Sequence, residues 1–327
     1  MNPLHSIVER FKDRRIAVFG DLVADVFVYG EISRISREAP VLILNHRETQ
    51  IVPGGGANAI HNLWALGAKP LPVGIVGDDA EGQQLLEYFS NLGIETGAIR
   101  VVKSYRTPSK MRILAGAVHS QRQQIVRLDS GAPLQEEKIR SAIEQKLKIA
   151  LGHADALLVS DYGYALALPQ LVSKIRKNSI PATIDSRFSL MDFSRMTAAT
   201  PNESEVESAL GISIGTDAKK LEWAGRTLLR RLQHDALLIT RGKDGMALFE
   251  RGKKTAHIPI HGSDEVADVT GAGDTVIATF TLALAAGASY YEAALLANYA
   301  GGIVVMKYGT RPVTRQELAA AVEKDAS

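Results

Sequence analysis

The sequence predicts an α/β protein built on an open, mostly parallel sheet that is covered by helices on both faces. Short apolar runs rich in β-branched residues alternate with longer helical stretches, which is the rhythm of right-handed βαβ units. The apolar runs are nearly continuous rather than alternating, as expected for strands that are buried on both faces. In two other segments short strands follow one another without helices, which predicts a small additional sheet.

The individual elements follow from where the apolar runs and the helical spacing fall. The predicted strands are residues 15–20, 71–77, 154–160, 180–185 and 235–240. The predicted helices are residues 56–66, 82–92, 136–151, 169–177 and 218–233. The N-terminal segment MNPLHSIVERFKDRR lacks the apolar core of a signal peptide and predicts a short amphipathic helix instead.

The two segments without helices are residues 25–52 and residues 99–128. No Pro- or Ser-rich linker or change in composition separates them from the rest of the chain. We therefore expect a single domain over residues 1–327, with a β-sheet lid formed by insertions at about 25–52 and 99–128. A lid sheet has edges and an apolar face that a second copy can cover, so a homodimer through the lid is one possible assembly.

Composition excludes several classes of protein. The chain has 327 residues, and its 38 basic and 36 acidic side chains leave a net charge of +2, which gives no reason to expect nucleic acid or a membrane surface as a partner. Cysteine is absent, so disulfides and thiolate metal sites are excluded. The most apolar stretch, residues 276–288, is shorter than the roughly 20 residues that a transmembrane helix needs. We expect a cytoplasmic protein.

The sharpest signal of chemistry is the octapeptide DVTGAGDT at residues 268–275, which precedes an apolar helical run. Gly271 and Gly273 allow backbone N–H groups to turn toward one point, and the helix N-terminus adds its positive end. This arrangement suits an anion such as a phosphoryl group in transfer. Asp274, in the first helical turn, can accept a proton from a hydroxyl held there. The alternative is a glycine turn in which Asp274 only stabilises the helix start.

A second signal is TPNESEVE at residues 200–207, directly after a predicted strand. On an opening helical turn Asn202 and Glu205 face the same way. An amide and a carboxylate there can hold magnesium-bound water and a nucleotide phosphate. The alternative is a capping box, with Asn202 as the N-cap and Glu205 reaching back to it.

Further polar residues follow strand ends or glycines. In PGGGANAIHNLWALG, residues 53–67, glycines allow a close approach of the backbone, and Asn58 is placed to bond a ligand from a helix start. Asp21 ends the first strand, where ligands of open α/β sheets collect. Asp161 and Asp185 end later strands in the same way, although a helix cap or turn residue is the better explanation of each of the three taken singly.

Several common constellations are missing. The chain has no GxxxxGK[ST] phosphate loop, and no GxGxxG follows the first strand, which argues against Walker-type ATPases and common dinucleotide enzymes. It also lacks HExxH and a nucleophile elbow.

The motifs form an ordered set. They are GD at 20–21, GGGAN at 54–58, GxxGDDxxG at 74–82, PNESE at 201–205, TRGKDG at 240–245 and DVTGAGDT at 268–275. In this order and spacing the chain resembles the ribokinase-like (PfkB) carbohydrate kinases over essentially its whole length. The resemblance implies one α/β domain with a β-sheet lid, and transfer of the γ-phosphoryl group of ATP to a sugar hydroxyl.

The resemblance also implies roles for individual residues. Asp274 would be the catalytic base, and the backbone at Gly271, Ala272 and Gly273 would form the anion hole. Asn202 and Glu205 would face the phosphates and Mg²⁺, with Glu205 holding the metal through water. The residues near the nucleotide would be Thr240, Gly242, Gly245 and Asn298, and those that hold the sugar would be Asp21, Gly55 and Asn58. Many relatives bind a monovalent cation beside the anion hole, so K⁺ is possible.

Within that family the chain is most similar to the subgroup that phosphorylates D-glycero-β-D-manno-heptose 7-phosphate at its anomeric hydroxyl, in ADP-heptose and lipopolysaccharide synthesis. The similar segments are residues 29–41, 159–163 and 297–314. The subgroup usually has GGAAN and DPK where this chain has GGGAN and Asp185-Ser186-Arg187. A phosphate on the acceptor would be held by basic side chains, and the candidates are Arg34, Arg37, Lys110, Arg112 and, as the best one, Arg187.

Two alternatives remain at this point. One is a kinase of the same family that acts on another sugar or sugar phosphate, and the other is a non-catalytic sugar-binding relative. The intact Asp274 and its glycines argue against the second alternative.

Overall fold

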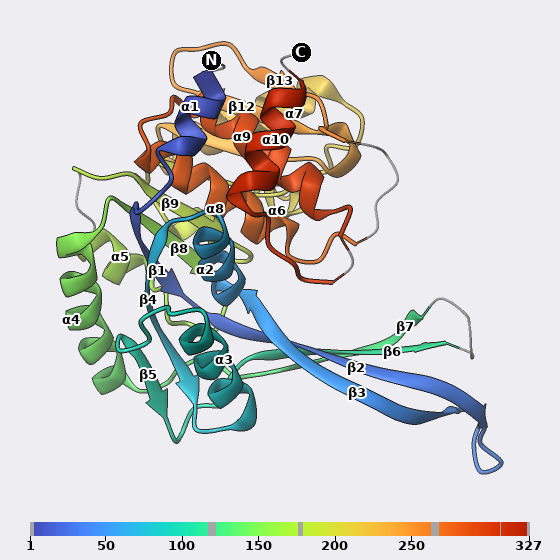
Figure 1. The fold of residues 1–327 in the computed structure, drawn as a ribbon. Helices are drawn as coiled ribbons and strands as arrows, with labels where there is room; N and C mark the ends of the chain where they lie inside the picture. The colour runs from blue at the N-terminus through green and yellow to red at the C-terminus, as the bar shows by residue number, and fades with distance from the viewer. Residues whose placement is uncertain (1–2, 117–121, 176–178, 263–267, 308, 326–327) are drawn as a thin grey trace.

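A nine-stranded sheet runs through the body and carries helices on both faces (Figure 1). From one edge to the other the strands are β13 (Ala256–Ile258), β12 (Met246–Glu250), β11 (Ala236–Thr240), β10 (Ala198–Ala199), β9 (Ala182–Ser186), β8 (Ala156–Asp161), β1 (Arg15–Gly20), β4 (Lys69–Gly77) and β5 (Ile99–Val102). All neighbours are parallel except β12, which is antiparallel to both β11 and β13. The computed structural model describes residues 3–116, 122–175, 179–262, 268–307 and 309–325.

Successive side chains of the central strands enter opposite faces of the sheet. In β1, Ile16 and Val18 belong to one buried cluster, whereas Ala17 and Phe19 belong to the other. The helices of the first cluster are α1 (Pro3–Glu9), α2 (Gly56–Ala65), α3 (Ala80–Asn91), α8 (Ala272–Ala285), α9 (Tyr290–Val304) and α10 (Arg315–Lys324). Those of the second are α4 (Glu137–His153), α5 (Pro169–Ile175), α6 (Glu203–Leu210) and α7 (Ala218–Leu232). The predicted open α/β sheet, covered on both faces, is confirmed.

The elements predicted from apolar runs and helical spacing coincide closely with observed ones. The predicted strands correspond to β1, β4, β8, β9 and β11, and the predicted helices to α2, α3, α4, α5 and α7. The predicted helix 169–177 is seen as α5, and its last residues lie outside the described residues. The antiparallel edge strands β12 and β13 were not predicted.

The second sheet is a lid of four strands that projects from the body (Figure 1). Its order is β3 (Leu42–Gly55), β2 (Leu22–Ile35), β6 (Ser109–Gly116) and β7 (Gln123–Ser130). β2 is antiparallel to β3, and β6 is antiparallel to β7, as the hairpin pattern predicts. The central pair, β2 and β6, is parallel and joins the two insertions into one sheet.

The second insertion is shorter than predicted. Residues 99–102, which the sequence analysis assigns to the lid, form β5 and pair in parallel with β4 of the main sheet. Ile99 and Val102 are buried there, because β4, α3 and β5 make one more βαβ unit. The lid segment of this insertion therefore begins at Ser109.

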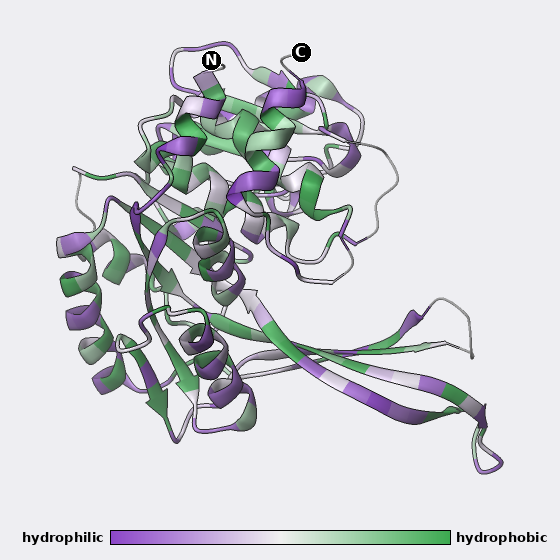
Figure 2. Cartoon of the chain, viewed as in Figure 1, coloured by the Kyte–Doolittle hydropathy of each residue, from purple (hydrophilic) through white to green (hydrophobic). Residues whose placement is uncertain are grey.

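The lid leaves apolar side chains exposed to solvent. Ile125, Val126 and Leu128 of β7 are all exposed, as are Val41 and Leu42 at the turn into β3. Figure 2 shows apolar residues along the strands of both sheets. Among the described residues, no helix has the length and hydropathy that crossing a membrane requires.

Two helical glycines distinguish tight from open packing. An ideal Cβ on Gly225 of α7 would lie 2.3 Å from Cζ of the buried Phe249 in β12, whereas one on Gly152 of α4 would meet nothing within 4 Å. We predict that Gly225→Ala lowers the free energy of unfolding by about 1–3 kcal/mol through overpacking. The control Gly152→Ala should instead raise the free energy of unfolding by about 0.5–1 kcal/mol, because alanine loses less backbone entropy than glycine when the helix forms. Urea unfolding of both variants checks this, and equal destabilisation would contradict it.

Candidate active site

The start of α8 is shaped by Gly271. This N-cap glycine has φ 77° and ψ 5°, a left-handed conformation that favours glycine. An ideal Cβ on it would lie 2.5 Å from Nδ2 of Asn58, so the position also makes room for that amide. The Ala272 N–H donates to Val269 O at 3.2 Å. Within the described part of the chain, the N–H groups of Gly271 and Gly273 have no hydrogen-bond partner and remain able to bind an anion.

Asp274 is buried in the first turn of α8, and it is hydrogen-bonded through both carboxylate oxygens. Asn58 Nδ2 donates to Oδ2 at 2.9 Å, and the Tyr162 hydroxyl donates to Oδ1 at 2.8 Å. Burial raises the pKa of Asp274 to about 6, although both hydrogen bonds and the charge of Lys110 oppose the rise. The carboxyl therefore titrates close to neutral pH, as suits a general base.

A buried polar ladder between α2 and α8 fixes Asn58. Asn62 Nδ2 donates to the backbone O of Asn58 at 3.0 Å and to its Oδ1 at 3.1 Å. Thr275 Oγ1 donates in turn to Asn62 Oδ1 at 3.1 Å. Because Oδ1 of Asn58 accepts from Asn62, its Nδ2 is turned toward Asp274.

Asp21 lies between β1 and β2 with one carboxylate oxygen held and the other available. Its Oδ2 accepts the N–H groups of Tyr162 at 2.8 Å and Tyr164 at 3.0 Å. Its Oδ1 is buried and makes no hydrogen bond with the described residues, although the Leu166 N–H is near enough to lower the pKa. Burial nevertheless raises the pKa of Asp21 to about 7. An oxygen of this kind is suited to accept a ligand hydroxyl.

The predicted nucleotide residues meet in one cavity beside the start of α8. Thr240, Gly242, Gly245 and Asn298 line this space of about 220 Å³ together with Ala272 and Gly273. Asn298 is held by its Nδ2, which donates to Pro259 O at 2.8 Å. An ideal Cβ on Gly273 would meet nothing within 4 Å, so the backbone there faces open space.

Asn202 and Glu205 make the capping box that the sequence analysis left as an alternative. Asn202 Oδ1 accepts the Glu205 N–H at 2.9 Å, and Glu205 Oε2 accepts the Asn202 N–H at 2.9 Å. Burial raises the pKa of Glu205, and burial together with the nearby Glu205 charge raises the pKa of Asp185. The two carboxyl groups are thus close, beside a cavity of about 380 Å³ that Glu205 lines with Arg187.

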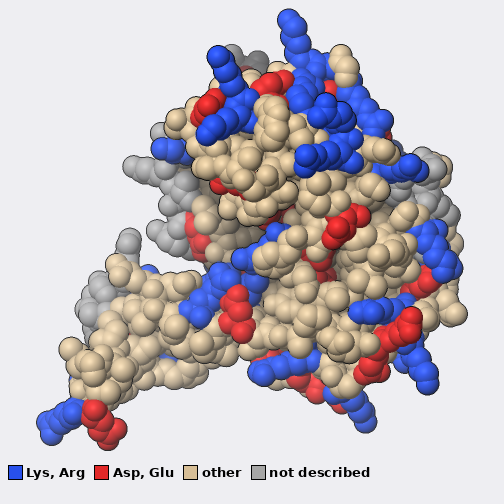
Figure 3. Space-filling model, turned by 180° about the vertical axis from the view of Figure 1, so that it is seen from behind, with Lys and Arg blue, Asp and Glu red and all other residues tan. Residues whose placement is uncertain are grey.

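The basic candidates are spread over the lid and the body. Arg112 Nη1 donates to Asp25 Oδ1 at 2.7 Å in a buried ion pair, and Lys110 Nζ lies 4.3 Å above the centre of the Tyr162 ring. Arg187 follows β9 and is exposed, and its charge adds to burial in lowering the pKa of Lys110. Arg34 and Arg37 lie at the far end of the lid hairpin. Basic side chains gather where the lid meets the body (Figure 3).

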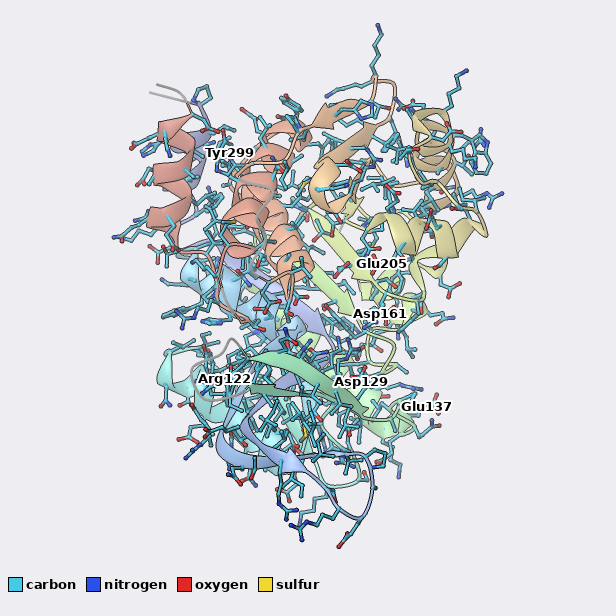
Figure 4. The ribbon with its side chains drawn as sticks, turned by 90° about the vertical axis from the view of Figure 1, so that its right-hand side faces the viewer. Arg122, Asp129, Glu137, Asp161, Glu205 and Tyr299 are labelled. Atoms are coloured by element: carbon cyan, nitrogen blue, oxygen red, sulfur yellow. The ribbon has the colours of Figure 1, made fainter. Side chains whose placement is uncertain are left out.

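The sequence analysis missed Tyr162 and Asp25. It weighed Asp161 in the segment VSDYG, but that carboxylate accepts the Gly163 N–H at 3.1 Å, a local turn contact, and Ser186 Oγ at 2.7 Å, a contact with the end of β9. Figure 4 shows Asp161 and Glu205 on the body and Asp129 on the neighbouring lid strand β7. A tyrosine directly after an acidic strand end was the signal for Tyr162, and Asp25 had no signal besides its place in an apolar strand.

The family model for pfkB family carbohydrate kinases matches residues 13–317. The chain belongs to this family. It is therefore an ATP-dependent phosphotransferase with an alcohol group as acceptor, as the ordered motifs predict.

The comparisons with individual proteins agree with this assignment. The chain is 38% identical over 322 residues to "Bifunctional protein HldE" of Coxiella burnetii (strain Dugway 5J108-111), covering 97% of this chain and 65% of the relative. It is 39% identical over 312 residues to the protein of the same name in Geobacter sulfurreducens (strain ATCC 51573 / DSM 12127 / PCA), covering 92% of this chain and 61% of the relative. The chain thus spans somewhat less than two thirds of these relatives.

Solved structures confirm the ribokinase-like fold. Ribokinase of Arabidopsis thaliana, complexed with ribose and ATP, superposes with a TM-score of 0.73 at 21% identity, over 95% of this chain and 99% of that one. Phosphofructokinase-2 of Escherichia coli, in complex with potassium, superposes with a TM-score of 0.76 at 17% identity, over 96% of this chain and all of that one.

We predict that Asp274→Asn lowers kcat about 100-fold while ATP binding and the melting temperature stay close to wild type. Asparagine keeps the shape and can still bond Asn58, but it cannot accept a proton. In the wild type, kcat should fall as the pH drops below about 6, because the protonated carboxyl no longer acts as a base. Steady-state kinetics from pH 5 to 9 checks both expectations, and near-normal turnover of the variant would remove Asp274 from the mechanism.

Proposed function

We propose that this kinase transfers the γ-phosphoryl group of ATP to the anomeric hydroxyl of D-glycero-β-D-manno-heptose 7-phosphate and gives the 1,7-bisphosphate. The observation that carries the proposal is the buried Asp274, held by Asn58 and Tyr162 at the N-terminus of α8 and next to the cavity lined by Gly273. The similarity to HldE proteins supports the choice of acceptor, and so does the resemblance to heptose 7-phosphate kinases noted in the sequence.

The chemistry follows from the places of these groups. The sugar would lie at the carboxyl ends of β1 and β8, where Oδ1 of Asp21 accepts one of its hydroxyls. Asp274 takes the proton of the reacting hydroxyl, whose oxygen attacks the γ-phosphorus while the bond to the β-phosphate oxygen breaks. The free N–H groups at Gly271 and Gly273 and the positive end of α8 stabilise the negative charge of the phosphoryl group.

Mg²⁺ is expected to be held through water. Among the described residues, no group of three or more His, Asp or Glu side chains could hold a metal ion directly. The charge of Glu205 adds to burial in raising the pKa of Asp185, and a hydrated divalent cation carried by the nucleotide phosphates would relieve this repulsion between the two carboxyl groups. When bound, Mg²⁺ neutralises phosphate charge. K⁺ beside the anion hole also stays a proposal, which the potassium complex of Escherichia coli phosphofructokinase-2 supports.

A homodimer through the lid is proposed as well. Its support is the exposure of Ile125, Val126 and Leu128 on β7, since a second copy would remove this apolar surface from water.

The direct test of the acceptor is a panel assay. The purified chain is given ATP and Mg²⁺ with heptose 7-phosphate, unphosphorylated heptose, fructose 6-phosphate or ribose, and ADP release is followed beside ³¹P NMR of the product. A new anomeric phosphate from heptose 7-phosphate alone supports the proposal. If the enzyme preferred another sugar, the proposed acceptor would be wrong, whereas the proposed kinase chemistry would stand.

We predict that Glu205→Gln raises the Mg²⁺ concentration needed for half-maximal rate several-fold, because it removes a charge that attracts the hydrated ion. The control is Glu292→Gln, since Ser289 and Glu292 make an equivalent capping box at the start of α9. Both variants should lose about 1 kcal/mol of stability or less. Magnesium titrations and melting curves of both variants separate a role in metal binding from a role in helix capping. An unchanged magnesium dependence of Glu205→Gln would leave Glu205 with a capping role only.

We predict that Arg187→Ala impairs the use of the phosphosugar far more than the use of the free sugar. Losing a charge-assisted contact of about 1.5–3 kcal/mol lowers kcat/KM about ten- to a hundredfold. Arg231→Ala, an exposed arginine at the end of α7, is the matched control. If the wild type turned over heptose and heptose 7-phosphate equally well, the phosphate pocket and the heptose 7-phosphate assignment would both be wrong.

A further inference from the structure

Tyr162, in the loop after β8, contacts several residues of the proposed site. Its hydroxyl donates to Oδ1 of Asp274 at 2.8 Å, and its backbone N–H donates to Oδ2 of Asp21 at 2.8 Å. Its ring packs on the backbone of Gly55, where an ideal Cβ would lie 3.1 Å from two ring carbons. Gly55 has φ 54°, so both its conformation and this close approach favour glycine.

The ring also contacts a cation that comes from the lid. Lys110 Nζ lies 4.3 Å from the ring centre, which is cation–π geometry. Lys110 pairs with Asp25 in the register of β2 and β6, but Asp25 is already bonded to Arg112 at 2.7 Å. Arg112 binds Oδ1 of Asp25, and the ammonium of Lys110 lies over the tyrosine ring, near enough to both Asp25 and Asp274 for the two carboxylates to favour its charged form.

We propose that Tyr162 is a positioning residue that couples the docking of the lid to the orientation of Asp274. The hydroxyl fixes one oxygen of the carboxylate, and Lys110 holds the ring in place only while the lid lies against the body. The inference rests on the proposed function, in which Asp274 is the base.

A purely structural role for Tyr162 would not need its hydroxyl. Phenylalanine would keep the ring contacts with Gly55 and Lys110, but Asp274 would then lose the donor to Oδ1 and keep only Asn58. The lost hydrogen bond is made to a buried carboxylate, where such bonds have their largest effect.

The groups that face Asp274 come from five elements, and each of them either favours or disfavours the charged form of its carboxyl group. Asn58 from α2, Tyr162 after β8 and Lys110 from β6 favour the carboxylate. Asp25 from β2, itself bonded to Arg112, disfavours it, and Asp185 at the end of β9 also faces it. Removal of either the hydroxyl or the ammonium therefore raises the pKa of Asp274 and shifts the acid limb of the pH profile upward.

The test uses Tyr162→Phe, Lys110→Met and the double variant, with heptose 7-phosphate as acceptor. Tyr162→Phe should lower the pH-independent plateau of kcat about tenfold, raise the acid limb by about one pH unit and leave the KM for ATP unchanged. Lys110→Met should act in the same direction, and Lys110→Arg should restore most of the plateau. The double variant should lose less plateau activity than the product of the two single losses.

The matched control is Tyr88→Phe, which removes a hydroxyl that bonds His61 at 3.2 Å, away from the site, and which should change neither plateau nor profile. ¹³C NMR titration of the Asp274 carboxyl gives a readout that needs no acceptor, and its pKa should rise in Tyr162→Phe. If Tyr162→Phe changed neither the titration of the Asp274 carboxyl nor the plateau of kcat while Asp274→Asn was inactive, the inference about Tyr162 would be wrong and the proposed function would stand. An active Asp274→Asn would overturn the proposed function itself. If Tyr162→Phe fails to fold, the variants Lys110→Met and Lys110→Arg test the inference by the same two measurements.

Discussion

The arrangement of this molecule depends on keeping one carboxylate buried at the start of an apolar helix. Asp274 loses most of its hydration there, and the cost is offset by hydrogen bonds from other elements. One donor is on α2 and the other is in the loop after β8, so both must pack tightly against α8. The glycines at 55 and 271 permit this packing, because a side chain at either position would strike Tyr162 or Asn58.

The same packing places binding and chemistry at one edge of the sheet. Parallel strands all present their carboxyl ends to that edge, and Asp21, Tyr162 and Asp185 lie at or just after the ends of β1, β8 and β9. The cavity beside Gly273 adjoins them across the first turn of α8. Lys110 approaches from β6 of the lid sheet.

Local patterns made the strands and the glycine motifs predictable, whereas long-range contacts escaped prediction. Buried strands such as β1 and β8 are continuous apolar runs, and the motif ending in Asp274 has an unusual composition. β5 was misassigned because four residues cannot reveal whether their partner is the body or the lid. Tyr162 was missed because it meets Asp274 across 112 positions of sequence, a distance over which no spacing rule applies.

The parallel pairing of β2 with β6 also has a consequence for biosynthesis. In that pairing Ala24 lies opposite Ser109, so β2 is synthesised well before its partner strand β6 and is unpaired on that side until β6 has been made. Until then the long hairpin of β2 and β3 presents an open edge, and open edges recruit other chains. β3 is an outer strand of the finished lid as well, and charged residues along it, such as Arg47 and Glu48, are suited to keep this second edge from pairing with other chains.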